Sequence, residues 1–212
     1  MGDEVARILA GAAYGRFPPP DGTTTIVRQP NPRDAGVLAF TAHSVVFTDE
    51  DPAWVGATLA AASGDPLAAS MNPGFLSALM ARTGRHMNTI DLLTVADHRP
   101  GPPELELDEI EDPDHPRVAR AMKFRDDVRV WSADGGVLVL GRGVAGRWEA
   151  AIEVDLEARG SGLGARLADA ARHLVPDAHV WAQQSPGNAR SVRTFQQAGY
   201  RPIGSEALLV AG

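Results

Sequence analysis

The stretch from Val154 to Leu174 constrains the fold of this chain most, because it passes from the period of a strand to that of a helix within a few residues. Residues 148–154 alternate apolar and polar, as a half-buried strand does. Downstream, apolar residues recur at helical spacing, at Leu163, Leu167, Ala170, Ala171 and Leu174. Between the two periods lie three glycines, Gly160, Gly162 and Gly164. The sequence therefore predicts a strand, a glycine-bearing turn and a helix in succession.

This turn has the features of a phosphate-binding loop. The first N–H groups of a helix have no partner within the helix and lie at the positive end of its dipole, so an anion is their natural ligand. Glycines lack the Cβ atoms that would keep ligand oxygens away from the backbone. Arg159 adds a fixed charge and a fork of donors that suits phosphate. A tight turn without a ligand is the alternative, and Arg159 beside the glycines favours the phosphate site.

Two segments in the second half of the chain match sequence motifs that occur together in known proteins. Residues 159–164, R-G-S-G-L-G, fit R/Q-x-x-G-x-G/A, and residues 188–200, N-A-R-S-V-R-T-F-Q-Q-A-G-Y, follow a short strand at 179–182. In this order, with these elements between them, they resemble the two signatures of the GNAT superfamily of acyl-CoA-dependent N-acetyltransferases. The resemblance is confined to the C-terminal half. It implies a transferase that moves the acetyl group of acetyl-CoA to an amine.

Composition excludes several other classes of protein. The net charge of −7 and pI of about 5.3 offer nothing to attract nucleic acid or an anionic membrane surface. The chain has no cysteine, which removes disulfides, thiol nucleophiles and thiolate metal ligands. No apolar run reaches the ~18 residues of a membrane span, and the N-terminus lacks the basic start of a signal peptide. We expect a cytoplasmic protein without a metal, and the single lysine, Lys123, hints at a GC-rich bacterial genome.

The expected fold is α/β (α+β), with a GNAT-like mixed sheet flanked by helices after a smaller α/β region. Residues 98–103, H-R-P-G-P-P, form the predicted linker between an N-terminal region of unknown role, 1–97, and an N-acetyltransferase domain, 104–212. In the first region we expect helices at 4–13, 51–62 and 72–83 and strands at 23–27, 36–47 (one bent or two short) and 90–95. In the second we expect strands at 104–110, 128–131, 136–141, 148–154, 179–182 and 201–210, helices at 116–124 and 163–174, and a further helix for which Asn188 is a good N-cap.

The resemblance also assigns residues to acetyl-CoA. Main-chain groups of Ile152, Glu153 and Val154 would bond the pantetheine arm as an added strand does. Pyrophosphate would lie on the amides of six consecutive residues beside Arg159, namely Gly160, Ser161, Gly162, Leu163, Gly164 and Ala165. From the second motif, Asn188 would reach pantetheine, and three further residues would lie near the cofactor, Ser191, Arg193 and Phe195.

Direct attack of an amine on the thioester requires a base and a group that stabilises the oxyanion. The candidate bases are Glu149 and Glu153, both on the strand that would carry the thioester; the solvated face of a strand is the alternative reading of each. Many members of the family have a tyrosine as general acid at the position of Phe195, and we do not expect Tyr200 to replace it. A thiolate with a pKa near 8.5 is a tolerable leaving group without an acid.

Two other functions compete with this one. Gly160, Gly162 and Ala165 also fit a relaxed dinucleotide fingerprint, but Gln183 and Gln184 stand where an acidic ribose ligand would be expected. The second alternative is a non-catalytic acyl-CoA-binding or scaffold module with a degenerate site. The acceptor, a small-molecule or peptide amine, is left unidentified by the sequence, and a homodimer is left open.

Overall fold

Helices and strands are interleaved along the chain, and the expected mixed α/β class is confirmed. The structure is a computed structural model that describes residues 3–112, 114–175 and 178–211. Contacts divide the chain into two compact units. Unit 1 comprises Met1–Leu93 and Ile203–Gly212, and unit 2 comprises Thr94–Pro202.

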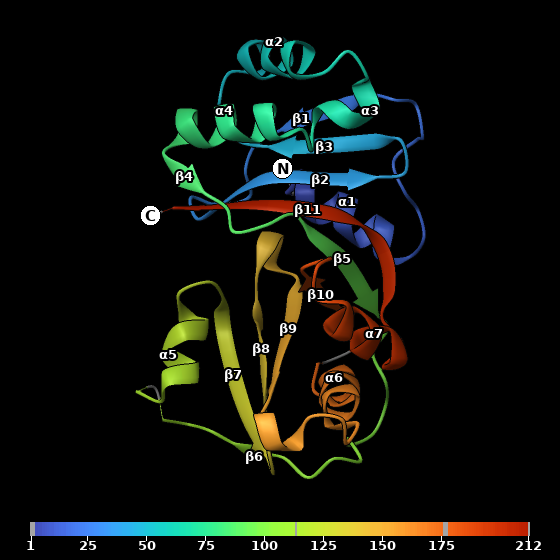
Figure 1. Cartoon of the computed structure of the whole chain (residues 1–212), viewed down its shortest axis with the longest axis vertical. Helices are drawn as coiled ribbons and strands as arrows, with labels where there is room; N and C mark the ends of the chain where they lie inside the picture. The colour runs from blue at the N-terminus through green and yellow to red at the C-terminus, as the bar shows by residue number, and fades with distance from the viewer. Residues whose placement is uncertain (1–2, 113, 176–177, 212) are drawn as a thin grey trace. The chain divides into compact units, whose positions relative to one another are not determined.

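Unit 1 contains four short helices and a sheet of mixed direction among its described residues (Figure 1). Strand β1 pairs parallel with β3, β3 pairs antiparallel with β2, and β2 pairs antiparallel with β11, which also pairs with β4. The bounds are α1 Glu4–Ala13, β1 Thr24–Val27, β2 Asp34–Phe40, β3 His43–Phe47, α2 Pro52–Ala62, α3 Pro66–Ala69, α4 Pro73–Thr83, β4 Arg85–His86 and β11 Arg201–Ala211.

Side-chain caps and one apolar layer explain the helices of unit 1. Asp3, Asp51 and Asn72 accept main-chain N–H groups at the starts of α1, α2 and α4, as residues of these types do at N-caps. Buried residues of α2 and α4, including Val55, Leu59, Phe75, Leu76 and Leu79, pack on Val37, Val46, Ala207 and Leu209 of the sheet. The expected stretch at 36–47 forms two strands, because the chain reverses at Ala42 with φ 52°.

Unit 2 carries the segments that resemble GNAT signatures. Its strands follow the order β10-β9-β8-β7-β6, with β9 parallel to β10 and the other neighbours antiparallel. The elements are β6 Asp108–Glu109, α5 Pro116–Met122, β7 Asp126–Ala133, β8 Gly136–Arg142, β9 Trp148–Val154, α6 Leu163–His173, β10 Val180–Gln184 and α7 Ala189–Gln197. Strand β5, Asp91–Ala96, ends in this unit, where Thr94 Oγ1 donates to the Ala182 carbonyl (3.0 Å).

The two faces of the β7–β9 sheet bury different helices (Figure 1). On one face, Leu163, Leu167 and Ala171 of α6 pack in a large core with Ala150, Leu138 and Leu140 of the strands. On the other, Val118 and Ala121 of α5 pack on Val130, Val139 and Ala151. Because side chains of a strand alternate between faces, β9 presents its even-numbered residues to α6 and its odd-numbered residues to α5.

Two sequence expectations for elements need correction. The strand expected at 104–110 is wrong except for β6 at Asp108–Glu109: Leu105 and Leu107 alternate because both pack in the core of α6, without a strand ladder. Helix α3 was not expected, although Asp65 before Pro66 is the same start signal as Asp51 before Pro52.

The segment expected as a linker, 98–103, is fastened to α6. The N–H of Arg99 donates to the Arg172 carbonyl (3.0 Å), and His173 Nδ1 contacts the Gly101 carbonyl (2.9 Å). The boundaries between the units lie after Leu93 and after Pro202, so the last strand belongs mostly to unit 1. The division into 1–97 and 104–212 as separate domains stays a prediction.

Candidate cofactor and acceptor site

Strand β9 directs alternate main-chain groups away from its partner β8. The N–H of Asp155 donates to the Gly135 carbonyl (2.9 Å), and the N–H of Gly143 donates to the Arg147 carbonyl (3.0 Å). In an antiparallel pair of strands, every second residue exchanges main-chain hydrogen bonds with the partner strand. These two bonds therefore show that the odd-numbered residues of β9 hydrogen-bond to β8. The main-chain groups of Ile152 and Val154 therefore face the β10 side, whereas those of Glu153 are used by β8.

Strand β10 follows β9 for only a short distance. Within the described residues, the pairing comprises Val180 with Trp148 and Trp181 with Glu149. Beyond it, the Gln183 side chain donates to Glu149 Oε1 (3.0 Å). The rest of β9, from Ala150 to Val154, therefore offers main-chain groups at an edge that β10 does not pair. Such an edge can accept an extended ligand as an added strand.

At the end of β9 the chain turns into α6 through a loop with left-handed glycines. Gly160 has φ 89° and Gly162, the N-cap of α6, has φ 83°. A Cβ at Gly162 would meet no atom within 4 Å, so the positive φ and not packing explains this glycine. In the described structure, the N–H groups of Gly160, Gly162 and Gly164 have no protein acceptor. These three N–H groups are the donors that an anion could use.

The remaining polar groups of the loop hold its shape. Ser161 Oγ donates to the Ala158 carbonyl (2.7 Å) and accepts the N–H of Leu163 (3.3 Å). The N–H of Ala165 donates to the Gly162 carbonyl (3.1 Å), so it is not one of the available donors. Arg159 Nε donates to the Val154 carbonyl (3.3 Å), which ties the arginine to the end of β9. Leu163 itself is buried in the core.

A pocket of about 400 Å³ lies over this loop. Its lining includes Arg159 and all of the predicted loop residues except Ser161, and it adds three residues of α7, Arg190, Thr194 and Gln197. Arg190 was missed by the sequence analysis, which named Ser191 and Arg193 on the same helix. Those two residues do not line the pocket, because the helical phase of α7 turns residues 190, 194 and 197 toward the loop.

The second motif contains a helix cap, Asn188, and a buried aromatic ring, Phe195. The Asn188 side chain accepts the N–H of Ser191 (3.1 Å) and caps α7. Phe195 does not line the pocket over the loop, because its ring is buried in the core with an edge-on contact to Tyr200 (4.9 Å between centroids); its expected place near the cofactor stays a prediction. The Tyr200 hydroxyl donates to the Ala168 carbonyl (3.1 Å), and burial raises its pKa above the usual range. Tyr200 is therefore unsuited to act as a general acid.

Glu149 is the centre of a buried ion cluster. Its carboxylate accepts from Arg147 Nε (2.8 Å), Arg125 Nε (3.2 Å), the Gln183 side chain (3.0 Å) and the N–H of Val144 (3.3 Å). A Cβ at Gly143 would overlap this carboxylate, so a glycine is needed there. Burial opposes ionisation of Glu149, but Arg147, Arg125 and these hydrogen bonds outweigh it and hold its pKa below the ordinary value. A carboxylate so stabilised is a weak base.

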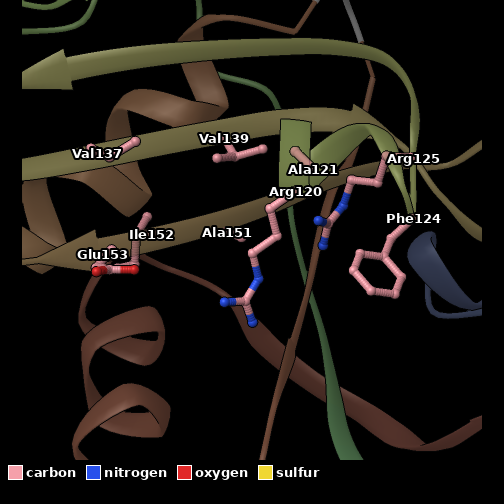
Figure 2. Close-up of a pocket in the computed structure, with 9 residues that line it drawn as sticks. All are labelled: Arg120, Ala121, Phe124, Arg125, Val137, Val139, Ala151, Ile152 and Glu153. Carbon is pink, nitrogen blue, oxygen red and sulfur yellow. The ribbon is translucent and has the colours of Figure 1, made fainter. Parts of the chain in front are cut away.

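Glu153 is the more accessible of the two candidate bases. It is exposed on the same face of β9 as Glu149, across Ala151. Glu153 lines a second pocket of about 240 Å³, between α5 and strands β8 and β9. Figure 2 shows Val137, Val139 and Ala151 as its apolar floor, with Glu153 at one end and Arg120, Arg125 and Phe124 at the other. The roles of both glutamates in catalysis stay predictions.

Neither a metal centre nor a membrane span is found among the described residues. Over the described ranges, no group of three or more His, Asp or Glu side chains is placed to hold a metal ion. In the same residues, none of the helices combines the length and the apolar character needed to cross a bilayer.

Comparisons with known proteins find similar structures only. No protein-family model and no curated protein matches the sequence. The chain is similar to a GCN5-related N-acetyltransferase from Kribbella flavida, with 17% identity and a TM-score of 0.45, over 100% of this chain and 96% of that one. It is also similar to one from Sphaerobacter thermophilus (12%, TM-score 0.40, 65% of this chain and 56% of that one) and to a tandem GNAT protein from the clavulanic acid biosynthesis pathway (16%, 0.40, 64% and 57%).

The chain thus spans a little over half the length of the latter two structures. All three carry names of the family that the two sequence motifs resemble. These similarities concern the course of the backbone, and the chemistry of this chain rests on the residues of its own site.

Proposed function

We propose that this protein is an N-acetyltransferase that moves the acetyl group of acetyl-CoA to an amine. The observation that carries the proposal is the continuity of two binding features: the unpaired edge of β9 leads directly into the loop whose N–H groups at Gly160, Gly162 and Gly164 have no acceptor among the described residues. Pantetheine would bond the edge at Ile152 and Val154, and pyrophosphate would lie on the loop, next to Arg159 and Arg190.

In the proposed reaction the acceptor amine attacks the thioester carbonyl directly. The C–N bond forms, the C–S bond breaks, the amine proton passes to a base, and CoA leaves as a thiolate. A main-chain N–H of β9 on the β10 side would stabilise the oxyanion. No general acid is needed for a thiolate with a pKa near 8.5. The burial of Phe195 and the occupied hydroxyl of Tyr200 are compatible with that route.

The two glutamates would have different parts in this reaction. Glu153 is exposed at the pocket between α5 and strands β8 and β9, and we assign it the role of base, acting directly or through water. Glu149 is assigned a positioning role, because its carboxylate is held by two arginines and joins β9 to Gln183 of β10 where the strands separate.

A non-catalytic acyl-CoA-binding module is the second candidate. The low pKa of Glu149 and the absence of a tyrosine at Phe195 favour it. It predicts acetyl-CoA binding without release of CoA in the presence of amines, so binding and turnover have to be measured separately.

Calorimetric titration with acetyl-CoA tests the proposed loop. The variant Gly162→Glu places a carboxylate at the position of the pyrophosphate, and we expect it to lose acetyl-CoA affinity by roughly 100-fold or more through charge repulsion and a blocked anion site. The matched control is Gly101→Glu, since Gly101 also has a positive φ (82°) and open space around its Cβ.

The control variant introduces the same backbone strain and the same charge at a different position, so a loss of affinity found only in Gly162→Glu is due to the loop itself. Full affinity in Gly162→Glu, or an equal loss in Gly101→Glu, would show that pyrophosphate does not bind at this loop.

A further inference from the structure

The pocket on the α5 side of β9 carries two guanidinium groups that the proposed reaction does not use. Arg120 extends from α5 and Arg125 from the segment before β7, and Figure 2 shows both directed into the same opening beside the ring of Phe124. In the part of the chain that the structure describes, the Arg120 side chain has neither a hydrogen bond nor an ion pair. Its charge is therefore available to a ligand.

Arg125 is held in place by the buried cluster. Its Nε binds Glu149 (3.2 Å), and its side chain is 16% exposed. Glu149 is shared with Arg147, which is 4% exposed, so a single buried carboxylate faces two buried or nearly buried guanidinium groups. Of these groups only Arg125 lines the pocket, and together with Arg120 it places two guanidinium groups at this end of the wall. A positive wall of this kind attracts an anion and repels a second cation.

The opposite end of the pocket has the other sign. Glu153 lies there, and the floor between the two ends is made by the apolar side chains of Val137, Val139 and Ala151. Phe124, which is 45% exposed, adds an aromatic surface beside the arginines. The volume of about 240 Å³ lies just below the usual range of ligand pockets, which begins at about 300 Å³. A molecule that complements the basic end, the apolar floor and the acidic end is small, with an anionic group at one end, a cationic group at the other and an apolar portion between them.

We propose that this pocket binds the acceptor, and that the acceptor is a small ω-amino acid, in which an apolar stem separates the primary amine from the carboxylate. The carboxylate lies against Arg120 and Arg125, the amine lies near Glu153, and the apolar portion covers the floor. Ile152 joins the two sites, because it lines this pocket while its main-chain groups face the proposed pantetheine edge. This assignment of substrate class rests on the proposed function, which supplies the reacting thioester.

Equilibrium binding of matched ligands tests the charge preference without requiring turnover. 6-Aminohexanoate, 6-aminohexanamide and hexylamine share an amine and an apolar stem but differ at the far end. A second set, with a shorter stem, consists of 5-aminopentanoate, 5-aminopentanamide and pentylamine. Calorimetry is carried out with and without saturating CoA. We expect the carboxylate-bearing member of a set to bind about tenfold tighter than its neutral-ended partners, as for a charge-assisted hydrogen bond at a partly exposed site.

Variants of Arg120 locate the preference. Arg120→Gln should reduce it to less than about threefold and Arg120→Lys should retain most of it, because the charge remains. The matched control is Arg129→Gln, since Arg129 lies outside this pocket in an exposed pair with Glu109. Glu153→Gln should weaken the binding of 6-aminohexanoate but leave the binding of hexanoate, which lacks the amine, unchanged.

The results separate this inference from the proposed function. If neither ligand set shows a carboxylate preference in the wild-type protein, or if Arg120→Gln keeps the preference, the acceptor assignment is overturned even where acetyl-CoA binds. If the preference and its loss in Arg120→Gln are found while acetyl-CoA does not bind, the anion pocket stands and the acetyltransferase assignment fails.

Discussion

Unit 2 has two regions suited to anions, and they are built in different ways. The loop at 159–165 offers main-chain N–H groups whose directions are fixed by the start of α6. The α5-side pocket offers guanidinium groups on long side chains, one of them held by a buried carboxylate. Main-chain donors cannot be removed by a single side-chain substitution, whereas the pocket depends on individual residues. Loss of an arginine beside the loop should therefore lower ligand affinity only modestly, whereas loss of the buried Glu149 should strongly lower the stability of the cluster that holds Arg125 in the pocket.

The largest effect is expected from Glu149→Leu. This change leaves Arg147 and Arg125 without their shared carboxylate, and breaking a buried ion pair in this way costs about 3–5 kcal/mol of the free energy of unfolding. Urea unfolding monitored by circular dichroism measures it. The control is Glu157→Leu, an exposed residue, which should change stability by no more than about 0.5 kcal/mol. Equal stability of the two variants would mean that the cluster does not support the pocket.

The same cluster should make stability depend on pH. The folded-state pKa of Glu149 is lowered, so its ionic contribution is fully present above the ordinary value of 4.5 and is lost as the pH falls through the folded-state pKa. The stability difference between the wild type and Glu149→Gln should therefore be constant from pH 8 to pH 5 and shrink below about pH 4.5. Urea unfolding at several pH values checks this, and a difference that grows on acidification would contradict it.

The loop should respond more weakly to loss of its cations. We expect Arg159→Gln and Arg190→Gln each to reduce acetyl-CoA affinity by about 3- to 10-fold, since each removes one charge near phosphate and leaves the N–H donors in place. Calorimetry at low and high salt measures both. The reference is Arg193→Gln, a residue of α7 outside the pocket lining. A loss above 100-fold in either variant would mean that side chains and not the backbone dominate binding.

The smallest effect is expected from Ser161→Ala. Its hydroxyl binds the Ala158 carbonyl and the Leu163 N–H, so the change should lower the free energy of unfolding by about 1 kcal/mol and acetyl-CoA affinity by less than about threefold. Parallel urea unfolding and calorimetry separate the two effects. A large loss of affinity without a loss of stability would show that the hydroxyl itself contacts the ligand.

The sequence predicted the loop because its glycines set the course of the backbone. The spacing of Gly160, Gly162 and Gly164 and the change of period around them specify a turn into a helix, and the structure has that turn. Arg190 was missed because the choice among neighbouring residues of α7 depends on the helical phase, which the structure sets through the packing of Phe195 and Ala198.

The ion cluster could not be predicted from the sequence. Two partners of Glu149, Arg125 and Gln183, lie 24 and 34 residues away from it in the sequence, and only the folded sheet brings them together. The strand expected at 104–110 is wrong for a related reason, because alternation of Leu105 and Leu107 reports burial and does not require a pairing strand. The first region was predicted well where caps mark the starts of helices, as at Asp51 and Asn72.

Thermal unfolding in the presence of acetyl-CoA, CoA, NAD or buffer alone tests the central claim most directly. A ligand at 100 times its dissociation constant stabilises the native state by about 2.7 kcal/mol. The proposed site predicts a rise in the midpoint with acetyl-CoA and CoA, and none with NAD. A midpoint unchanged by acetyl-CoA, or raised only by NAD, would contradict an acyl-CoA site at the loop after β9.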